Sequence, residues 1–433
     1  MYQQTFTRLM MKRSTILLLL GCTFLTFGYT RDQTGALVSK IYLHNTTLIR
    51  TTPGVDIWFY DLSTPANVRE VGSIRIDGNS DVATYNTTMY ADQEHDLVVY
   101  DISNPAQARP VDTIPDIFYR SGTEIANWLN GNSWDGGNEL GGASGCGADG
   151  CDVNNGSSDS DFDNSWDDTW GGGSMSDYQP LSYSSNGSMG VTNAATSTST
   201  SGSSSNSTTS GVGGNRREGT GGSLARFIIV GKRLYCIDNK DLIVFDLTNP
   251  SEPKLLKRTE VSQDIETIFY AKYHLFIGGQ QGVYIYDVED NIDPQYRGEF
   301  QHVERCDPVV VDGDRAYVTL RGDSPCGGTT SQMDILDVSD VEHPRLLKSY
   351  EKLNSPFGLA VRNGIAIVCD GQSGLRVLNV ENENRVKECG KVTDITPFDV
   401  IWQDNMLIVT AKEGFFLYDA SDPCNLKKYS QLF

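Results

Sequence analysis

Apolar and polar positions repeat along this chain with a period near 40 residues. In each repeat, a short apolar run ending in Asp or Asn precedes a turn and a strand-like segment that carries Lys or Arg. The clearest copies read LVVYDISNP (residues 97–105) and LIVFDLTNP (residues 242–250). The residues that close the apolar runs are 61, 101, 246, 287, 337, 379 and 419. A period of this length with four strand-like segments per unit is typical of β-propeller blades.

The last repeat shows how one unit is built. Strands are predicted at residues 398–402, 406–411, 414–420 and 426–431, rich in Val, Ile, Tyr and Phe and separated by Gly, Asn and Asp turns. The Asp that ends each third strand is expected to accept N–H bonds from the turn, and Asn379 is expected to replace it partly in the sixth unit. The sequence therefore predicts an all-β, seven-bladed β-propeller of four-stranded blades. Its first blade is complete only if residues 37–44 and 47–52 form strands.

The spacing of the repeats also divides the chain into segments. Blades one and two are predicted within residues 38–118, and blades three to seven within residues 224–433. Residues 119–223 lie between them and are rich in Ser, Gly, Asn, Asp and Thr. Such a segment buries too little apolar area to offset the entropy of ordering, so we predict a mostly disordered, low-complexity insertion.

The N-terminus has the pattern of an export signal. Met11-Lys12-Arg13 precedes the short apolar run Ser14–Leu20, and Leu19-Leu20-Gly21-Cys22 resembles a bacterial lipobox. We therefore predict a signal peptide over residues 1–21, a lipid on Cys22 and a tether over residues 22–37. The expected location is the outer membrane, with the protein facing the periplasm or the cell surface. The alternative is an ordinary signal peptide that is cleaved near Gly28, which would give a secreted protein.

The repeats resemble those of the bacterial LVIVD-repeat family, which is named for the apolar run before the Asp of the third strand. The resemblance covers residues 38–118 and 224–433, and the runs at 98–105 and 242–250 carry it best. Blade six departs from the pattern, with Asn379 and no proline in its turn. The resemblance implies an exported propeller, often a lipoprotein, and implies no catalytic residues.

The charge of the chain limits its partners. The formal net charge is −21 at pH 7, whereas binding of nucleic acid requires clustered Lys and Arg. We therefore expect no nucleic acid, and membrane attachment through the lipid alone. The partner is left open as an envelope protein, a glycan or a small molecule.

The cysteines fit an exported protein, in which disulfides are permitted. Besides Cys22 the chain has eight cysteines, and their pairing cannot be read from sequence. Cys306 and Cys326 should flank neighbouring strands of blade five, which makes them a candidate pair. Cys146 and Cys151 are a second candidate pair, within the insertion.

Alignment of the inner strands predicts a partly acidic, partly aromatic entrance to the central channel. The candidate binding residues there are Asp81, Glu266, Asp307, Phe357, Phe398 and Asp399. Such a funnel could hold a cation or a basic ligand. Calcium is the cofactor considered, although Asp159, Asp161 and Asp163 lack the glycine and glutamate that would complete an EF-hand loop.

The motifs of common enzymes are missing from the sequence, including the nucleophile elbow, the zinc-protease motif and the phosphate loop. The favoured interpretation is a non-enzymatic scaffold for ligand binding or protein interaction at the cell envelope. One alternative is a hydrolase or lyase with a site built across blades at the channel mouth. A remote alternative is an adhesin that uses Arg321-Gly322-Asp323.

Overall fold

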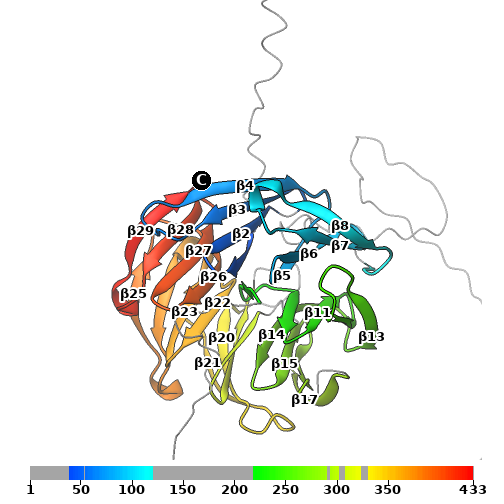
Figure 1. Cartoon of the computed structure of the whole chain (residues 1–433). Helices are drawn as coiled ribbons and strands as arrows, with labels where there is room; N and C mark the ends of the chain where they lie inside the picture. Colours follow the sequence, from blue (N-terminus) through cyan, green and yellow to red (C-terminus); the bar gives the residue numbers. More distant parts are fainter. Residues whose placement is uncertain are drawn as a thin grey trace, which may run out of the picture. The chain divides into compact units, whose positions relative to one another are not determined.

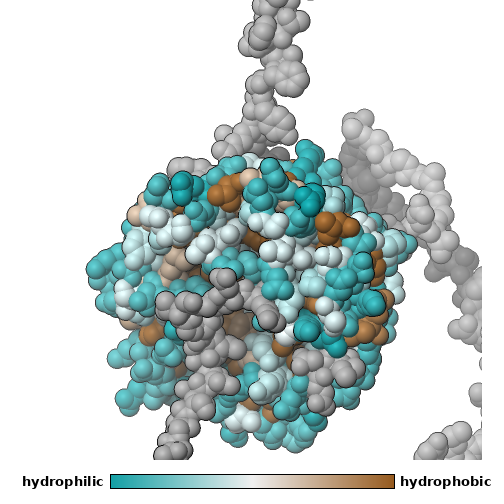
Figure 2. All heavy atoms as spheres, viewed as in Figure 1, coloured by the Kyte–Doolittle hydropathy of each residue, from teal (hydrophilic) through white to brown (hydrophobic). Residues whose placement is uncertain are grey.

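Seven antiparallel sheets surround a central channel in the computed structural model, which describes residues 39–52, 54–119, 218–289, 293–301, 308–322 and 330–432 (Figure 1). Six sheets have four strands and one has five. This confirms the predicted all-β, seven-bladed propeller. Over the described ranges, no helix is long and apolar enough to cross a membrane. The face shown in Figure 2 is mostly hydrophilic, with small and separate hydrophobic patches.

Each blade uses its strands in chain order, from an inner strand at the channel to an outer strand at the rim. Blades one to three contain β1 (Lys40–His44), β2 (Thr47–Thr52), β3 (Asp56–Asp61), β4 (Arg69–Arg75), β5 (Val82–Tyr85), β6 (Thr88–Gln93), β7 (Asp96–Asp101), β8 (Arg109–Ile114), β10 (Phe227–Val230), β11 (Arg233–Asp238), β12 (Asp241–Asp246) and β13 (Lys254–Glu260).

The same order continues through the other four blades, which confirms the four strands predicted for the last one to within two residues at each end. They contain β14 (Ile265–Ala271), β15 (His274–Gly279), β16 (Gly282–Asp287), β17 (Gln295–Gln301), β18 (Val309–Asp312), β19 (Arg315–Leu320), β20 (Gln332–Asp337), β21 (Arg345–Tyr350), β22 (Leu359–Arg362), β23 (Ile365–Cys369), β24 (Leu375–Asn379), β25 (Lys387–Val392), β26 (Pro397–Gln403), β27 (Met406–Ala411), β28 (Gly414–Asp419) and β29 (Lys427–Leu432).

The hydrophobic core lies between the blades. The middle strands are buried on both faces because each blade is covered by its two neighbours, so their sequences are continuous apolar runs. The ring closes by the same packing, since blade one lies beside blade seven (Figure 1) and the rings of Tyr60 and Phe415 are 4.8 Å apart. Ser430 Oγ also donates to Pro65 O across this junction, at 2.8 Å. Each end of the ring thus has a whole blade, and β1 and β2 meet the condition that the sequence left open for blade one.

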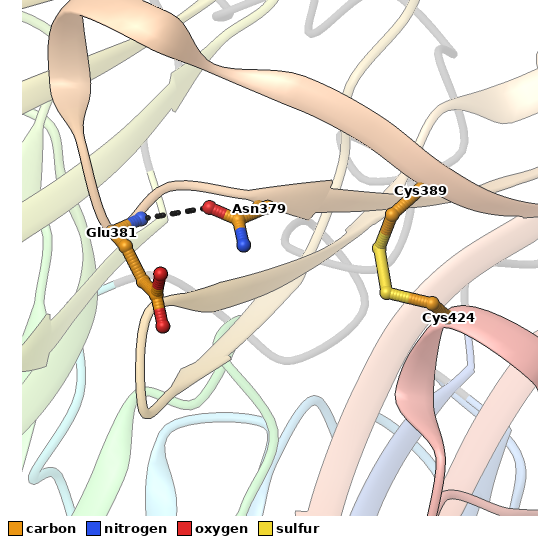
Figure 3. The surroundings of a disulfide bond; sticks show 4 residues. All are labelled: Asn379, Glu381, Cys389 and Cys424. Carbon is orange, nitrogen blue, oxygen red and sulfur yellow. Dashed lines mark hydrogen bonds between the residues drawn. A yellow bond between two sulfur atoms is a disulfide. The ribbon is translucent and has the colours of Figure 1, made fainter.

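The Asp after each third strand fixes the following turn. Asp101 Oδ1 accepts from the backbone N–H of Ser103 at 3.0 Å, and Asp101 Oδ2 accepts from Arg109 at 2.9 Å. In blade six, Asn379 Oδ1 accepts from the N–H of Glu381 at 3.2 Å (Figure 3), so the amide supplies the turn bond without the charge. The prediction for both residue types is confirmed.

Every outer strand has a β-bulge at the same register, which places one extra residue opposite the third strand. The bulged residues are Val71, Val111, Leu256, Arg297, Leu347, Cys389 and Tyr429.

The bulged residue of blade six forms a disulfide with the next blade. Cys389 bonds to Cys424 in η4 (Pro423–Asn425), the turn of blade seven, with their Cα atoms 5.1 Å apart (Figure 3). Cys236 and Cys369 are free and buried. The predicted pairs Cys306–Cys326 and Cys146–Cys151 lie outside the described residues, as do Cys22 and the N-terminal segments.

The predicted end of the insertion needs correction. The sequence placed residues 119–223 in the insertion, yet residues 218–223 belong to the propeller and include a fifth strand of blade one, β9 (Thr220–Gly221). The Gly- and Thr-rich composition of this stretch resembles the low-complexity segment before it. Its order comes from backbone hydrogen bonds rather than from buried apolar side chains.

Candidate functional site

Residues 218–226, the channel segment, run along the inside of the ring. β9 pairs antiparallel with β1, through Thr220 opposite Leu43 and Gly221 opposite Tyr42. Glu218 bridges to Tyr85 at the end of β5, and Tyr42 Oη donates to Gly219 O at 3.1 Å. The channel segment therefore enters where the inner strands end and runs toward the face where they begin.

At that second face the channel segment is bonded to most of the ring. Ser223 Oγ accepts from the N–H of Leu359 in blade six at 2.9 Å, and Ala225 O accepts from Ile268 in blade four at 2.9 Å. Gly222 donates to Ile41 O in blade one at 3.1 Å. Together with bonds to blades two and seven, these contacts cover the end of the channel where the inner strands begin.

The hydrogen bonds between the channel segment and blade seven are formed by Asp399. Its Oδ1 accepts from the N–H of Ser223 at 3.1 Å, from Ser223 Oγ at 3.2 Å and from the N–H of Val400 at 2.9 Å. A Cβ on Gly222 would lie 1.9 Å from Asp399 Oδ2, and a Cβ on Gly358 would lie 2.5 Å from Oδ1. This close approach of backbone to carboxylate requires glycine at both positions.

Burial raises the pKa of Asp399 to about 7, although the bonds from Val400 and Ser223 and the charge of Lys40 favour the ionised form. The other oxygen of this carboxyl, Oδ2, is buried and has no hydrogen-bond partner in the described part of the chain. Asp399 is therefore a carboxyl group that takes up a proton near neutral pH.

The channel segment contacts blade two through an ionic network around Arg226, which is 6% exposed. Its backbone N–H donates to Asp81, and its guanidinium donates to Ser80 Oγ at 2.8 Å and to Asp238 Oδ1 at 3.1 Å. Asp92 Oδ2 is 3.8 Å from the same guanidinium.

Lys40 extends this network, with its Nζ 3.3 Å from Asp81 Oδ2. Two cations thus face three buried carboxylates. Burial raises the pKa of Asp92 and lowers that of Lys40, so the low-dielectric setting favours the neutral form of each.

The predicted entrance residues are divided among several roles. Asp81 and Asp399 are buried and bonded to the channel segment, so neither carboxylate is open to a ligand in this conformation. Phe357 and Phe398 do meet, with ring centroids 5.5 Å apart. Glu266 lies half-buried in β14, and Asp307 is outside the described residues.

The first residue of the Arg321-Gly322-Asp323 motif also packs against the propeller. The guanidinium of Arg321 lies over the ring of Phe357, 4.1 Å from its centroid, while Asp323 lies outside the described residues. The acidic residues Asp159, Asp161 and Asp163 are outside as well. Within the ranges that the structure describes, no group of three or more His, Cys, Asp or Glu side chains could hold a metal ion.

The rest of the channel is a cavity of about 170 Å³ between the channel segment and the inner strands of blades four to seven. Its ionisable lining residues are Lys272, Asp312 and Arg362, which lie where the inner strands end. The other lining residues are Thr220, Gly221, Gly222, Ser223, Phe269, Ala271, Val310, Val311, Gly313, Leu359, Ala360, Val361, Asn363, Val400, Ile401 and Trp402. The cavity therefore has apolar walls and a charged mouth, at the opposite end from the predicted entrance.

Sequence reasoning missed this cavity because it missed the channel segment that forms one wall. The available signal was the close spacing of Gly219, Gly221 and Gly222 just before blade three, which permits tight backbone approach. Within a glycine-rich insertion this signal does not stand out.

Two solved structures are similar to this chain over nearly its whole length. A Bacteroides uniformis protein provisionally assigned as a 6-phosphogluconolactonase shares 8% identity, with 90% of this chain and 94% of that chain covered and a TM-score of 0.53. A Lactobacillus plantarum protein shares 11% identity, with 91% and 96% covered and a TM-score of 0.52. At these identities the likeness shows the fold alone.

The comparisons by sequence are narrower. A search of the curated proteins found no match. The profile of the LVIVD repeat matches residues 81–109 and 221–260, which are the first three strands and outer turn of blade two, and the end of the channel segment with blade three. The chain is therefore a seven-bladed β-propeller that carries LVIVD repeats.

Proposed function

We propose that this protein is a non-enzymatic, exported binding propeller, held at the cell envelope by a lipid on Cys22, and that it binds a small molecule in the channel cavity. The observation that carries the proposal is the channel segment. By covering one end of the channel, it leaves a recess between itself and the inner strands of blades four to seven, with Lys272, Asp312 and Arg362 at the other end.

The cavity has the features of a small-ligand site. It is concave, mostly apolar and bounded by strands that neighbouring blades hold in place, with a few polar groups near its mouth. Its volume of about 170 Å³ is below the roughly 300–1,000 Å³ of sites for drug-sized ligands, so it suits a smaller molecule.

The lining favours binding over catalysis. The deep wall consists of side chains such as Phe269, Val310 and Ala360, which offer no group for proton transfer or nucleophilic attack. Two of the four carboxylates predicted at the entrance, Asp81 and Asp399, are engaged by Lys40, Arg226 and Ser223 instead.

Ligand binding is tested with the mature full-length protein and a panel of small aliphatic and aromatic molecules, followed by saturation-transfer NMR. The Ala360→Trp variant fills the cavity and should lose the signals that the wild type gives. Val310→Trp fills the cavity from blade five, so that a loss of binding in both variants does not depend on a local folding defect at one position. Val111→Trp at the exposed rim is the matched control. Binding that survives in both cavity variants, or a wild type that binds no member of the panel, would overturn the proposal.

Export and lipid attachment are supported by the lipobox-like residues and by the Cys389–Cys424 disulfide, which suits an oxidising compartment. Cells labelled with a palmitate analogue test this part. The wild type should carry label and sediment with membranes, and Cys22→Ala should do neither. A Cys22→Ala protein that is still labelled and membrane-bound would overturn the anchor.

A further inference from the structure

We infer that the channel cavity selects a zwitterion with an apolar body, of the class of a free α-amino acid with an aliphatic or aromatic side chain. This inference rests on the proposed function and specifies its ligand. It starts from two opposite charges at the mouth, Asp312 at the end of β18 and Arg362 at the end of β22, which come from neighbouring blades.

Neither residue forms an ion pair within the part of the chain that the structure describes. Arg362 donates to the backbone oxygen of Asp404 at 2.8 Å, and this carbonyl carries no net charge. Across the described ranges, no ion pair forms at Arg362 or at Asp312, whereas the third charged residue of the mouth, Lys272, is paired with Asp314. Among the described residues, the mouth thus presents one cation and one anion that form no ion pair.

The partial burial of these two residues strengthens the electrostatic attraction that each can exert on a ligand. Asp312 and Arg362 are both half-buried, so water screens them less than it screens fully exposed ion pairs. The two do not pair with each other, although both line the same cavity. A molecule that carries an ammonium and a carboxylate on neighbouring atoms satisfies both, with the carboxylate at Arg362 and the ammonium at Asp312.

The apolar wall of the cavity determines which side chain the ligand can have. Phe269 and Trp402 provide aromatic surfaces on opposite sides of blades five and six, and Val310, Ala360 and Val400 lie between them. A side chain that enters this space gains by leaving water, at roughly 25 cal/mol per Å² of apolar area buried. A polar side chain would lose its hydration without finding partners, so we expect discrimination against serine and glutamine.

The test is isothermal titration calorimetry on the mature full-length protein with four probes of one shape. L-Phenylalanine carries both charges, 3-phenylpropanoate lacks the ammonium, phenethylamine lacks the carboxylate, and 3-phenylpropan-1-ol lacks both. Phenylalanine should bind about tenfold more tightly than either singly charged probe, because each removed charge leaves one half-buried partner unpaired.

Two variants test which residue binds which charge of the ligand. Arg362→Gln should weaken phenylalanine and 3-phenylpropanoate about tenfold and leave phenethylamine within about twofold. Asp312→Asn should show the converse pattern. Lys348→Gln and Asp340→Asn, which change charge away from the cavity, should alter none of the four affinities, and thermal melts should show that every variant folds.

The outcomes separate this inference from the function on which it rests. Equal binding of all four probes, abolished by Ala360→Trp, would overturn the zwitterion and leave a small-molecule site in the cavity. Binding that Ala360→Trp does not change would overturn both. If none of the four probes binds, the ligand class is wrong, and the broader NMR panel then decides whether the cavity binds small molecules at all.

Discussion

Asp399 of blade seven accepts two hydrogen bonds from Ser223, its partner 176 residues earlier in the sequence, at 3.1 and 3.2 Å. One carboxyl group thereby joins the last blade of the ring to the channel segment. The same group sits against Gly222 and Gly358 and has a pKa of about 7. Its protonation state and its steric surroundings both lead to measurable consequences.

The first prediction concerns pH. The pKa of Asp399 is raised from an ordinary value of 3.8 to about 7, so the folded state binds the proton more tightly than the unfolded chain does. This contribution to stability is complete below about pH 3.8, declines as the pH rises, and is lost once the pH passes about 7. Asp399→Asn removes it while keeping an oxygen for Ser223.

The difference in melting temperature between Asp399→Asn and the wild type should therefore shift in favour of the variant between pH 5 and pH 8. Differential scanning calorimetry at several pH values measures it. Asp92, whose pKa is also raised by burial, is present in both proteins and cancels in the difference. A difference that stays constant with pH would contradict the raised pKa of Asp399.

The second prediction concerns the space at Gly222. Gly222→Ala places a methyl group against Asp399 Oδ2 and should lower the melting temperature by several degrees, since a clash in a packed site costs about 1–3 kcal/mol. The double variant Gly222→Ala/Asp399→Ala should recover part of this loss. A comparison residue is Gly231, where an added Cβ meets nothing within 4 Å and only its φ of +61° opposes alanine. A double variant no more stable than Gly222→Ala would show that the clash lies elsewhere.

The third prediction concerns the buried network of blade two. Arg226→Met leaves Asp92 and Asp238 without their shared cation and should cost about 3–5 kcal/mol of unfolding free energy. Arg69→Met removes an arginine that also pairs with an aspartate, Asp61, but at an exposed site, and should cost under about 1 kcal/mol. Urea titrations of the two variants supply both values, and similar losses would mean that burial adds nothing to the Arg226 network.

The fourth prediction concerns the disulfide. The bond between Cys389 and Cys424 closes a loop of 35 residues, which restricts the unfolded chain and contributes about 3–4 kcal/mol in the chain-entropy description. Cys389→Ser/Cys424→Ser should therefore unfold at lower denaturant than the wild type under non-reducing conditions. With a reducing agent present the two proteins should become alike. A wild type that is insensitive to reduction would indicate that packing of η4 on blade six suffices.

Much of the fold could be predicted from the sequence because each blade repeats a local pattern. The apolar run before Asp101 or Asp246 is buried on both sides by neighbouring blades, and the Asp itself binds the turn. Both features depend on residues that lie within one unit. The number of blades and the role of Asn379 follow from such local signals, whereas the completeness of blade one was decided only by the strands β1 and β2 of the structure.

The candidate site could not be predicted in the same way, because it depends on contacts between distant residues. The alignment of inner strands placed Asp81 and Asp399 near the axis, and the structure places both beside the channel segment. What covers them is a glycine-rich stretch whose order comes from hydrogen bonds to backbone atoms such as Ile41 O and Thr84 O. Neither hydropathy nor periodicity signals a strand of that kind. The choice of Cys389 and Cys424 among eight cysteines likewise depends on how adjacent blades stack.

The channel segment also constrains the order in which the ring can assemble. Tyr42 and Leu43 pair with Gly221 and Thr220, which lie almost 180 residues later in the chain. Ser223 in turn bonds to Asp399 in the last blade. Such long sequence separations slow folding, because the entropy cost of closing a large loop comes before any stabilising contact forms. In the folded protein, the ring is therefore closed around a stretch of its own polypeptide. Only when blade seven is in place can Asp399 accept the hydrogen bonds from Ser223 that join the channel segment to the last blade.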